Sequence, residues 1–189
     1  MPRFQDIPRF VEDSNYCVHL TWSYLESQLQ SWTEEGLNLD PDFQRAHVWN
    51  EVQQSAYVEY ILQGGPSGKD IYFNSPRWPD VLKSGEEFVL VDGKQRVNAV
   101  LRFLHNEIQA FGYTFKQYTD RIHGSLQACF VVHVNGLQTR AEVLRWYLLF
   151  NSGGTPHTPE EIARVRDLLA KEPVTPIGRN NESSSRIRK

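Results

Sequence analysis

The chain has 189 residues, a formal net charge of −3, and a composition that is 40% hydrophobic and 23% charged. This length allows one domain with a hydrophobic core and is too short for two large ones. No apolar run approaches the roughly 18 residues that a membrane span requires. The small net charge argues against a protein whose whole surface binds nucleic acid, although it allows a local basic patch.

The N-terminal stretch and the cysteines predict a cytoplasmic protein. The first ten residues, MPRFQDIPRF, lack the apolar segment of a secretory signal peptide. Cys17 and Cys129 lie far apart and belong to no CxxC or Cys/His pair. We therefore expect two buried thiols in a reducing compartment, and no zinc site.

The predicted organisation is an N-terminal arm over residues 1–15, one domain over 16–171, and a tail over 172–189. The tail is polar and rich in serine, and its last residues carry four positive charges and one negative charge, which gives +3. Such a composition predicts disorder. Either a solubilising end or an arm that binds nucleic acid is compatible with this charge.

The first elements are predicted to be a strand and a helix. Residues 16–22 alternate loosely and are rich in strand-forming residues. Apolar residues then recur at helical spacing, with Ser23 as the expected N-cap and Gly36 as the stop. A short extended piece and a turn around Pro41 follow.

A second helix is predicted from Asn50, its expected N-cap, through Gln63. We place Val52, Ala56 and Tyr60 on one face of it, beside Tyr57 and Ile61. The next stretch, GGPSGKD, resembles a Walker A loop but lacks the GxxxxGK[ST] spacing and precedes a strand. We interpret it as the end of the helix and a turn.

Strands and helices interleave through the rest of the chain. Strands are predicted at residues 69–73, 88–91 and 128–134, and helices at 93–104, 140–150 and 159–171, the last with Thr158 as N-cap. The strand at 88–91 is apolar throughout, so it should be covered on both faces. This order predicts a mixed α/β (α+β) domain with a small mixed sheet flanked by helices.

The most informative junction is Asp92-Gly93-Lys94-Gln95-Arg96, where the apolar strand ends and the next helix begins. The first N–H groups of a helix lack intrahelical acceptors and carry partial positive charge, so an anion fits there. Glycine allows close approach of a phosphate, Lys94 and Arg96 add charge, and Asp92 is placed to hold Mg²⁺ or a water. Asp92 and Gln95 also match a capping box that needs no ligand, and both interpretations stay open.

Two further stretches are candidates. Residues 40–49, DPDFQRAHVW, gather carboxylates, Arg45, a histidine and a tryptophan beside a proline, as in a ligand rim. A simple turn with Arg45 in a surface ion pair explains them equally well. Residues 151–161, NSGGTPHTPEE, are a helix–helix connection on geometry alone. The six histidines form no HExxH or His-Asn-His motif.

Four motifs occur in the order of one known family: PDFQRAHVW, YILQGGPSGKDIYF, VDGKQR and FNSGGTPHTPEE. Over about residues 16–171 the chain resembles the N-terminal domain family of GmrSD-type, modification-dependent restriction systems, a branch of the ParB/sulfiredoxin-like fold. The resemblance implies that fold as a single domain, and a nucleotide site with NTP hydrolysis in several members.

The resemblance also implies which residues form the site. The family motif Asp-Gly-Gln-Gln-Arg matches this chain except at Lys94, which leaves the family's nucleotide chemistry in doubt. The implied nucleotide-binding residues are Gln44, Arg45, Gly93, Lys94, Gln95, Arg96, Asn151, Gly153 and Gly154. From the residues themselves we expect Asp92, Arg96 and Asp42 to be the catalytic residues, with Asp92 as the metal ligand.

These inferences lead to three hypotheses. The first is a stand-alone nucleotide-binding module that senses or regulates in restriction or phage biology, with an NTP and Mg²⁺ as cofactors and hydrolysis as an extension. The second is a DNA-binding or ParB-like nicking protein. The third is a non-catalytic module that blocks or completes a partner, such as a nuclease or a host or phage protein. No His-Asn-His nuclease domain fits in the sequence, so a complete cutting enzyme is not expected.

Overall fold

The structure is a computed structural model. It describes residues 16–44, 48–78, 86–120, 128–150 and 158–173. The strands of this part are β1 (Tyr16–Thr21), β2 (Leu37–Asn38), β3 (Asp70–Asn74), β4 (Phe88–Asp92) and β5 (Cys129–Asn135). The α-helices are α1 (Trp22–Glu34), α2 (Glu51–Leu62), α3 (Lys94–Leu104), α4 (Arg140–Phe150) and α5 (Pro159–Lys171), and a short 3₁₀ helix lies at Phe115–Gln117.

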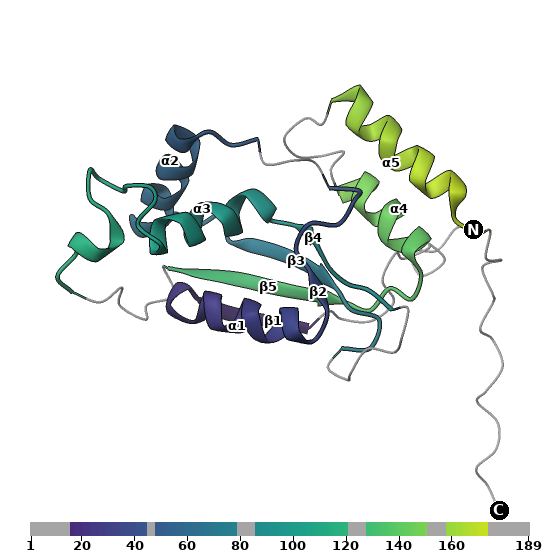
Figure 1. Cartoon of the computed structure of the whole chain (residues 1–189), viewed down its shortest axis with the longest axis horizontal. Coiled ribbons are helices and arrows are strands. Elements are labelled where there is room, and N and C mark those ends of the chain that lie inside the picture. The colour runs from purple at the N-terminus through teal and green to yellow at the C-terminus, as the bar shows by residue number, and fades with distance from the viewer. Residues whose placement is uncertain (1–15, 45–47, 79–85, 121–127, 151–157, 174–189) are drawn as a thin grey trace, which may run out of the picture.

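The five strands form one mixed sheet in the order β1-β5-β3-β4-β2 (Figure 1). β5 pairs antiparallel with β1 and parallel with β3, whereas β4 pairs antiparallel with β3 and parallel with β2. The predicted α+β class, with a small mixed sheet flanked by helices, is confirmed. The predicted domain limits, and the comparison with the ParB/sulfiredoxin-like fold, stay predictions.

The residues of β4 show how the sheet is covered. Phe88 and Leu90 belong to one hydrophobic cluster, to which α1, α2 and α3 contribute. Val89 and Val91 belong to a second cluster, to which α4 and α5 contribute. Because side chains alternate between the faces of a strand, helices cover β4 on both sides, as its apolar sequence predicts.

The start of α1 differs from the prediction. The helix begins at Trp22 with Thr21 as N-cap, so Ser23 lies inside the first turn and the predicted Ser23 cap is wrong. The N–H of Trp22 donates to the carbonyl of Ala128 at 3.0 Å. Because the helix follows β1 without a break, Thr21, the last residue of the strand, is the N-cap and makes no side-chain cap hydrogen bond.

Both predicted cap residues of the later helices are confirmed. Asn50 forms a capping box with Gln53 at the start of α2, and Thr158 forms one with Glu161 at the start of α5. Pro159 occupies the first turn of α5, where its missing N–H costs nothing. These caps depend on residues three apart, which a sequence shows directly.

The predicted face of α2 is wrong for Val52, Ala56 and Tyr60, whereas Ile61 and Tyr57 pack against the core as predicted. Val52 is 77% exposed and Tyr60 is 41% exposed, whereas Gln54, Val58 and Ile61 are buried. Gln54 occupies an interior position because its amide donates to the carbonyl of Trp49 at 2.8 Å and its oxygen accepts from Arg102 at 2.8 Å. A polar residue that the prediction did not place on the buried face therefore lies there, and its partner Arg102 comes from α3.

The two cysteines differ in their exposure. Cys129 is buried as predicted, but Cys17 is exposed because it lies on the edge strand of the sheet.

Among the described helices, none is both long enough and apolar enough to cross a membrane.

Candidate functional site

The junction between β4 and α3 is built around one glycine. Gly93 is the N-cap of α3 and has a left-handed backbone, with φ at 109°. A Cβ atom at this position would lie 2.4 Å from Cγ2 of Ile71. Both the conformation and the packing against β3 therefore require glycine, which gives this residue a structural role independent of any phosphate.

The capping box considered for Asp92 and Gln95 does not form. Asp92 is instead ion-paired with the guanidinium of Arg96, one helical turn away. The side-chain oxygen of Gln95 accepts hydrogen bonds from the backbone N–H groups of Val48 and Trp49, both at 3.1 Å. Since the N-cap residue is a glycine, no N-cap side chain covers the first turn of α3.

The two cations of the motif each have a carboxylate partner. Lys94 pairs with Asp40, whose side chain is 76% exposed, and Arg96 pairs with the less exposed Asp92. The Nε atom of Arg96 is buried and has no hydrogen-bond partner in the structure as described. A buried guanidinium N–H without an acceptor costs free energy, so Arg96 retains a donor that an anionic ligand could satisfy.

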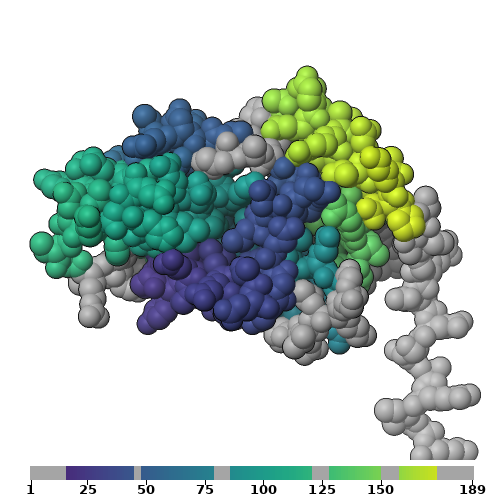
Figure 2. All heavy atoms as spheres, viewed as in Figure 1, coloured from purple at the N-terminus to yellow at the C-terminus, as the bar shows by residue number. Residues whose placement is uncertain are grey.

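Gln44 and Gln95 connect the segment after β2 to this junction. Gln44 is buried, and its amide donates to the carbonyl of Leu90 in β4. Arg164 of α5 donates to the carbonyl of Gln44 at 2.6 Å, which fixes the segment from the other side. Figure 1 shows this segment rising from β2 toward α5, and Figure 2 shows it on the surface between α3 and the α4–α5 pair.

Asp42 is held by a different cluster. Its carboxylate pairs with Arg140 at the start of α4, and Arg140 also pairs with Glu87 and Glu172, each at 3.2 Å. This cluster connects the turn at Asp42 to the start of β4 and the end of α5. The structure thus brings Asp92, Gly93, Lys94, Gln95, Arg96 and Gln44 together, and Asp42 joins the Arg140 cluster.

Four residues of the predicted site lie outside the described residues: Arg45, Asn151, Gly153 and Gly154. Arg45 follows Gln44, whose contacts with β4 and α5 are given above. The glycines and Asn151 follow the end of α4. Their assignment to the site stays a prediction.

A polar cluster beside the junction was missed by the sequence reasoning. Tyr72 is the cross-strand partner of Asp92, and its ring stacks on His133 with centroids 4.5 Å apart. His133 contacts the carboxylate of Asp70 at 2.7 Å. Burial raises the pKa of the Tyr72 hydroxyl; the charges of Asp70 and Asp92 add to the shift and that of Arg96 opposes it.

The signal for this cluster was present in the strand sequences. Asp70 and Tyr72 alternate with Ile71 and Phe73, which are fully buried. His133 lies between buried Val132 and Val134 in the same way. A period of two predicts a polar side of the sheet at these positions, whereas both stretches were interpreted simply as strands.

The junction can hold an anion, and its metal-binding capacity is limited. No group of three or more His, Cys, Asp or Glu side chains able to hold a metal ion occurs in the described ranges. Mg²⁺ needs fewer protein ligands, because it keeps several waters and binds through one or two carboxylates together with substrate phosphates. The Asp92 carboxylate therefore fits an ion that arrives with a nucleotide.

Comparisons with known proteins identify a family. The family described as GmrSD restriction endonuclease, N-terminal domain, matches residues 26–129, which is more than half of the chain and includes the whole β4–α3 junction. No match was found among curated proteins or among solved structures.

Proposed function

The chain belongs to the GmrSD restriction endonuclease N-terminal domain family, and from this we propose that it is a nucleotide-binding module acting in restriction or in the response to phage. The phosphates of an NTP bind at the start of α3, beside Gly93, Lys94 and Arg96. Hydrolysis of the NTP is a further step of the proposal, for which Asp92 is the candidate residue.

The buried, unpartnered Nε of Arg96 is the observation that carries this proposal. Arg96 lies in the first turn of α3, where the helix dipole favours negative charge. A phosphate oxygen accepting from Nε would satisfy this donor and add a charge-assisted hydrogen bond. The Asp92 partner of Arg96 would then be available to a cation accompanying the phosphates.

Mg²⁺ would reduce the repulsion between Asp92 and the phosphates and would polarise the phosphoryl group. Asp92 is the residue that would hold it. Lys94 pairs with the well-exposed Asp40, so the ammonium group can change partner at small cost, because exposed ion pairs contribute little stability.

Gln44 and Gln95 act as positioning residues in this proposal. Their hydrogen bonds attach residues 44 and 48 to β4 and α3. Arg45 lies between these two anchored positions in the sequence, which supports its predicted role in closing the site over the phosphates. Binding of the phosphates would therefore involve two segments that are about 50 residues apart in the chain.

Thermal unfolding with each common NTP and Mg²⁺ tests the proposal. A bound nucleotide stabilises only the folded state, so at least one NTP should raise the Tm of the parent protein. Arg96→Ala should weaken binding about 10- to 100-fold, which corresponds to the loss of one hydrogen bond to a charged group. Isothermal titration calorimetry gives the affinities directly.

Arg166→Ala is the matched control, because Arg166 is an exposed arginine on α5 and lies far along the chain from the junction. It should bind the NTP like the parent. Unchanged Tm of the parent with every NTP, or an Arg96→Ala protein that is folded and binds with parental affinity, would contradict the proposal.

A further inference from the structure

The outer edge of β1 is a second place where the molecule can bind a ligand. β1 is the terminal strand of the sheet and pairs only with β5 among the described strands. A terminal strand presents unpaired N–H and C=O groups along its outer side, which can pair with another extended chain. This surface is distinct from the β4–α3 junction, because two strands, β5 and β3, lie between β1 and β4 in the sheet.

The register shows which residues present these groups. Trp22 donates from its backbone N–H to Ala128, so this pair belongs to the hydrogen-bonded class of the antiparallel ladder. Hydrogen-bonded and non-hydrogen-bonded pairs alternate, so Cys17–His133 and His19–Val131 belong to the other class. The backbone groups of Cys17 and His19 therefore point outward, and no hydrogen bond joins them to any other described residue.

The sequence of β1 lacks the residues that usually block pairing at an edge. Natural edge strands are commonly blocked by lysine, another charged side chain, proline or a bulge. The sequence of β1, YCVHLT, contains no proline, lysine, arginine or carboxylate. Its pairing with β5 is regular from Tyr16 to Thr21.

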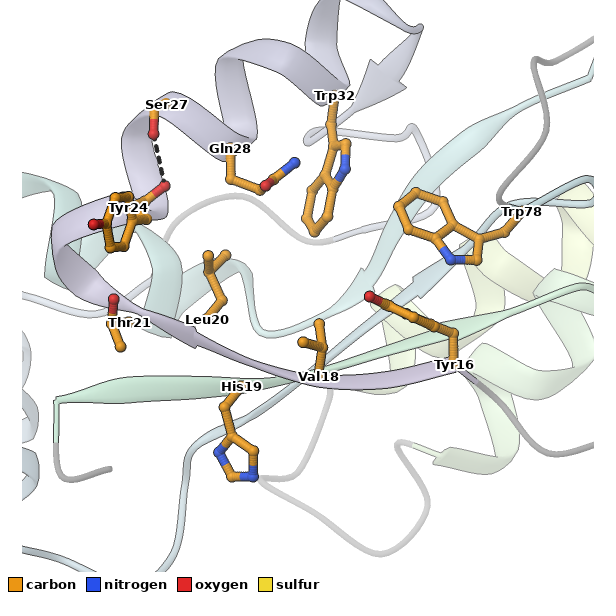
Figure 3. A pocket seen from close by; sticks show the side chains of 10 residues that line it. All are labelled: Tyr16, Val18, His19, Leu20, Thr21, Tyr24, Ser27, Gln28, Trp32 and Trp78. Atoms are coloured by element: carbon orange, nitrogen blue, oxygen red, sulfur yellow. Dashed lines mark hydrogen bonds between the residues drawn. The ribbon is translucent and has the colours of Figure 1, made fainter. Parts of the chain in front are cut away.

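A pocket of about 660 Å³ borders the same strand, between β1 and α1 (Figure 3). Val18 and Leu20 point into it from β1, and Trp32 points into it from α1, whereas His19 lies on the opposite side of the strand. Trp78 closes one end, with its ring 5.5 Å from that of Tyr16 and 5.6 Å from that of Trp32. Val18, Leu20 and the aromatic rings form a wall suited to an apolar side chain, and Thr21, Ser27 and Gln28 add polar groups to the lining.

Two polar groups of the pocket have no hydrogen-bond partner among the described residues. The buried indole Nε1 of Trp78 makes no hydrogen bond to any residue that the structure describes. Gln28 points its amide into the pocket from α1 (Figure 3), and within the described part of the chain it also has no hydrogen bond. A ligand with backbone amides would supply an acceptor for Trp78 and both kinds of partner for Gln28.

The charge around the pocket selects among peptides. Glu34 and Glu35 lie at the end of α1, close in sequence to Trp32 of the pocket, and residues 16–36 contain no lysine or arginine. Glu26 pairs with His105, which follows α3, and Arg77, next to Trp78, pairs with Glu86. Complementary charge favours a basic partner. A second copy of this chain would bring its own Glu34 and Glu35 toward those of the first, so a second copy is the less favoured occupant.

We propose that β1 and the adjoining pocket bind an extended basic peptide of a partner protein. The peptide adds a strand to the outer edge of β1, pairs with Cys17 and His19, and inserts one apolar side chain between β1 and α1. Main-chain hydrogen bonds supply affinity in this mode of recognition, and the pocket supplies specificity.

Synthetic decapeptides test the proposal. The probe is an acetylated and amidated peptide with alternating threonine and valine, a central leucine and two arginines; in the comparison peptide, glutamates replace the arginines. Tryptophan fluorescence reports binding, because Trp32 and Trp78 line the pocket. The basic peptide should bind with micromolar affinity that weakens with salt, and the acidic peptide at least about tenfold more weakly.

Matched changes separate strand pairing from other contacts. His19→Pro removes an outward N–H without touching the β1–β5 hydrogen bonds, and should weaken binding about tenfold; His19→Ala keeps that N–H and should bind like the parent. Trp78→Phe removes the indole donor but keeps an aromatic ring, and should weaken binding severalfold. Methylating alternate backbone nitrogens of the peptide blocks pairing in the unmodified protein, so the test does not depend on a variant that folds.

Three results would overturn the proposal. The first is a basic peptide that causes no change in fluorescence or in the NMR signals of β1. The second is equal binding of the methylated and unmethylated peptides. The third is a parent protein that forms a dimer in sedimentation and a His19→Pro protein that is monomeric, since the edge would then be occupied by a second copy.

Discussion

At the scale of the residue, Gly93 combines a left-handed backbone with close packing against Ile71. Gly93→Ala should lower the free energy of unfolding by about 2–5 kcal/mol, the sum of the penalty for a positive φ and the cost of overpacking. Urea denaturation measures this change. Gly112→Ala is the control, because Gly112 has a similar φ of 80° and no atom within 4 Å of its missing Cβ.

The control should cost only the conformational penalty, about 1–2 kcal/mol. Equal destabilisation by Gly93→Ala and Gly112→Ala would show that the contact with Ile71 does not constrain the junction. That result would favour the interpretation that glycine is needed for close approach of a phosphate.

The motif residues also show what a sequence can and cannot predict at this scale. Gly93 and Arg96 were singled out from the motif, and the structure gives both a definite local reason: a required conformation and a buried unpartnered donor. Gln95 was predicted to bind the nucleotide, yet its side-chain oxygen accepts hydrogen bonds from the backbone N–H groups of Val48 and Trp49. The local sequence pattern cannot show a hydrogen bond to residues almost 50 positions away.

At the scale of the element, Tyr57 joins α2 to the turn that follows it. Its hydroxyl donates to the carbonyl of Gly68 at 2.8 Å. Burial raises the pKa of this hydroxyl well above its ordinary value of 10.0, and Arg96 opposes the shift. The folded state therefore keeps the proton that the unfolded chain loses, so stability is complete below about pH 10 and falls as the pH rises further.

Tyr57→Phe should therefore change the pH dependence of stability. At neutral pH it should cost about 1 kcal/mol for the lost hydrogen bond, and above pH 10 its stability should fall less steeply than that of the parent. Urea denaturation between pH 8 and about 11 measures both effects. Tyr24→Phe, at a side chain that is 68% exposed, is the control variant. Parallel stability curves for Tyr57→Phe and the parent would contradict the assignment.

The helices show which of their features the sequence predicts and which depend on tertiary contacts. The N-caps Asn50 and Thr158 bond neighbours three residues away and were predicted correctly. The face of α2 was wrong in part because Gln54 is buried, with Arg102 of α3 as one of its partners. Local rules fixed these two caps, whereas tertiary contacts decide which face of α2 is buried and where α1 begins.

At the scale of the whole molecule, the sheet brings together residues that are distant in the sequence. β4 ends at Asp92 beside Tyr72 of β3, which in turn stacks on His133 of β5. The alternating mixed elements predicted the α+β class, but the strand order β1-β5-β3-β4-β2 was not predictable from them. That order decides which residues lie beside the junction, so the sequence alone did not identify Tyr72 and His133 as its neighbours.

The two proposed sites lie on different parts of the sheet. The nucleotide site is at the end of β4, and the peptide site is at the outer edge of β1, with β3 and β5 between them. A peptide that binds without any response to NTP would support the second proposal and leave the first to its own test.

The central claim is that phosphates bind at the first turn of α3. The most direct measurement is a ¹H–¹⁵N NMR titration of the whole chain with the NTP and Mg²⁺. The largest shifts should belong to the backbone amides of Gly93, Lys94 and Arg96, because these groups lie at the N-terminus of the helix. Unchanged positions of these three signals at a saturating concentration of every common NTP would contradict it.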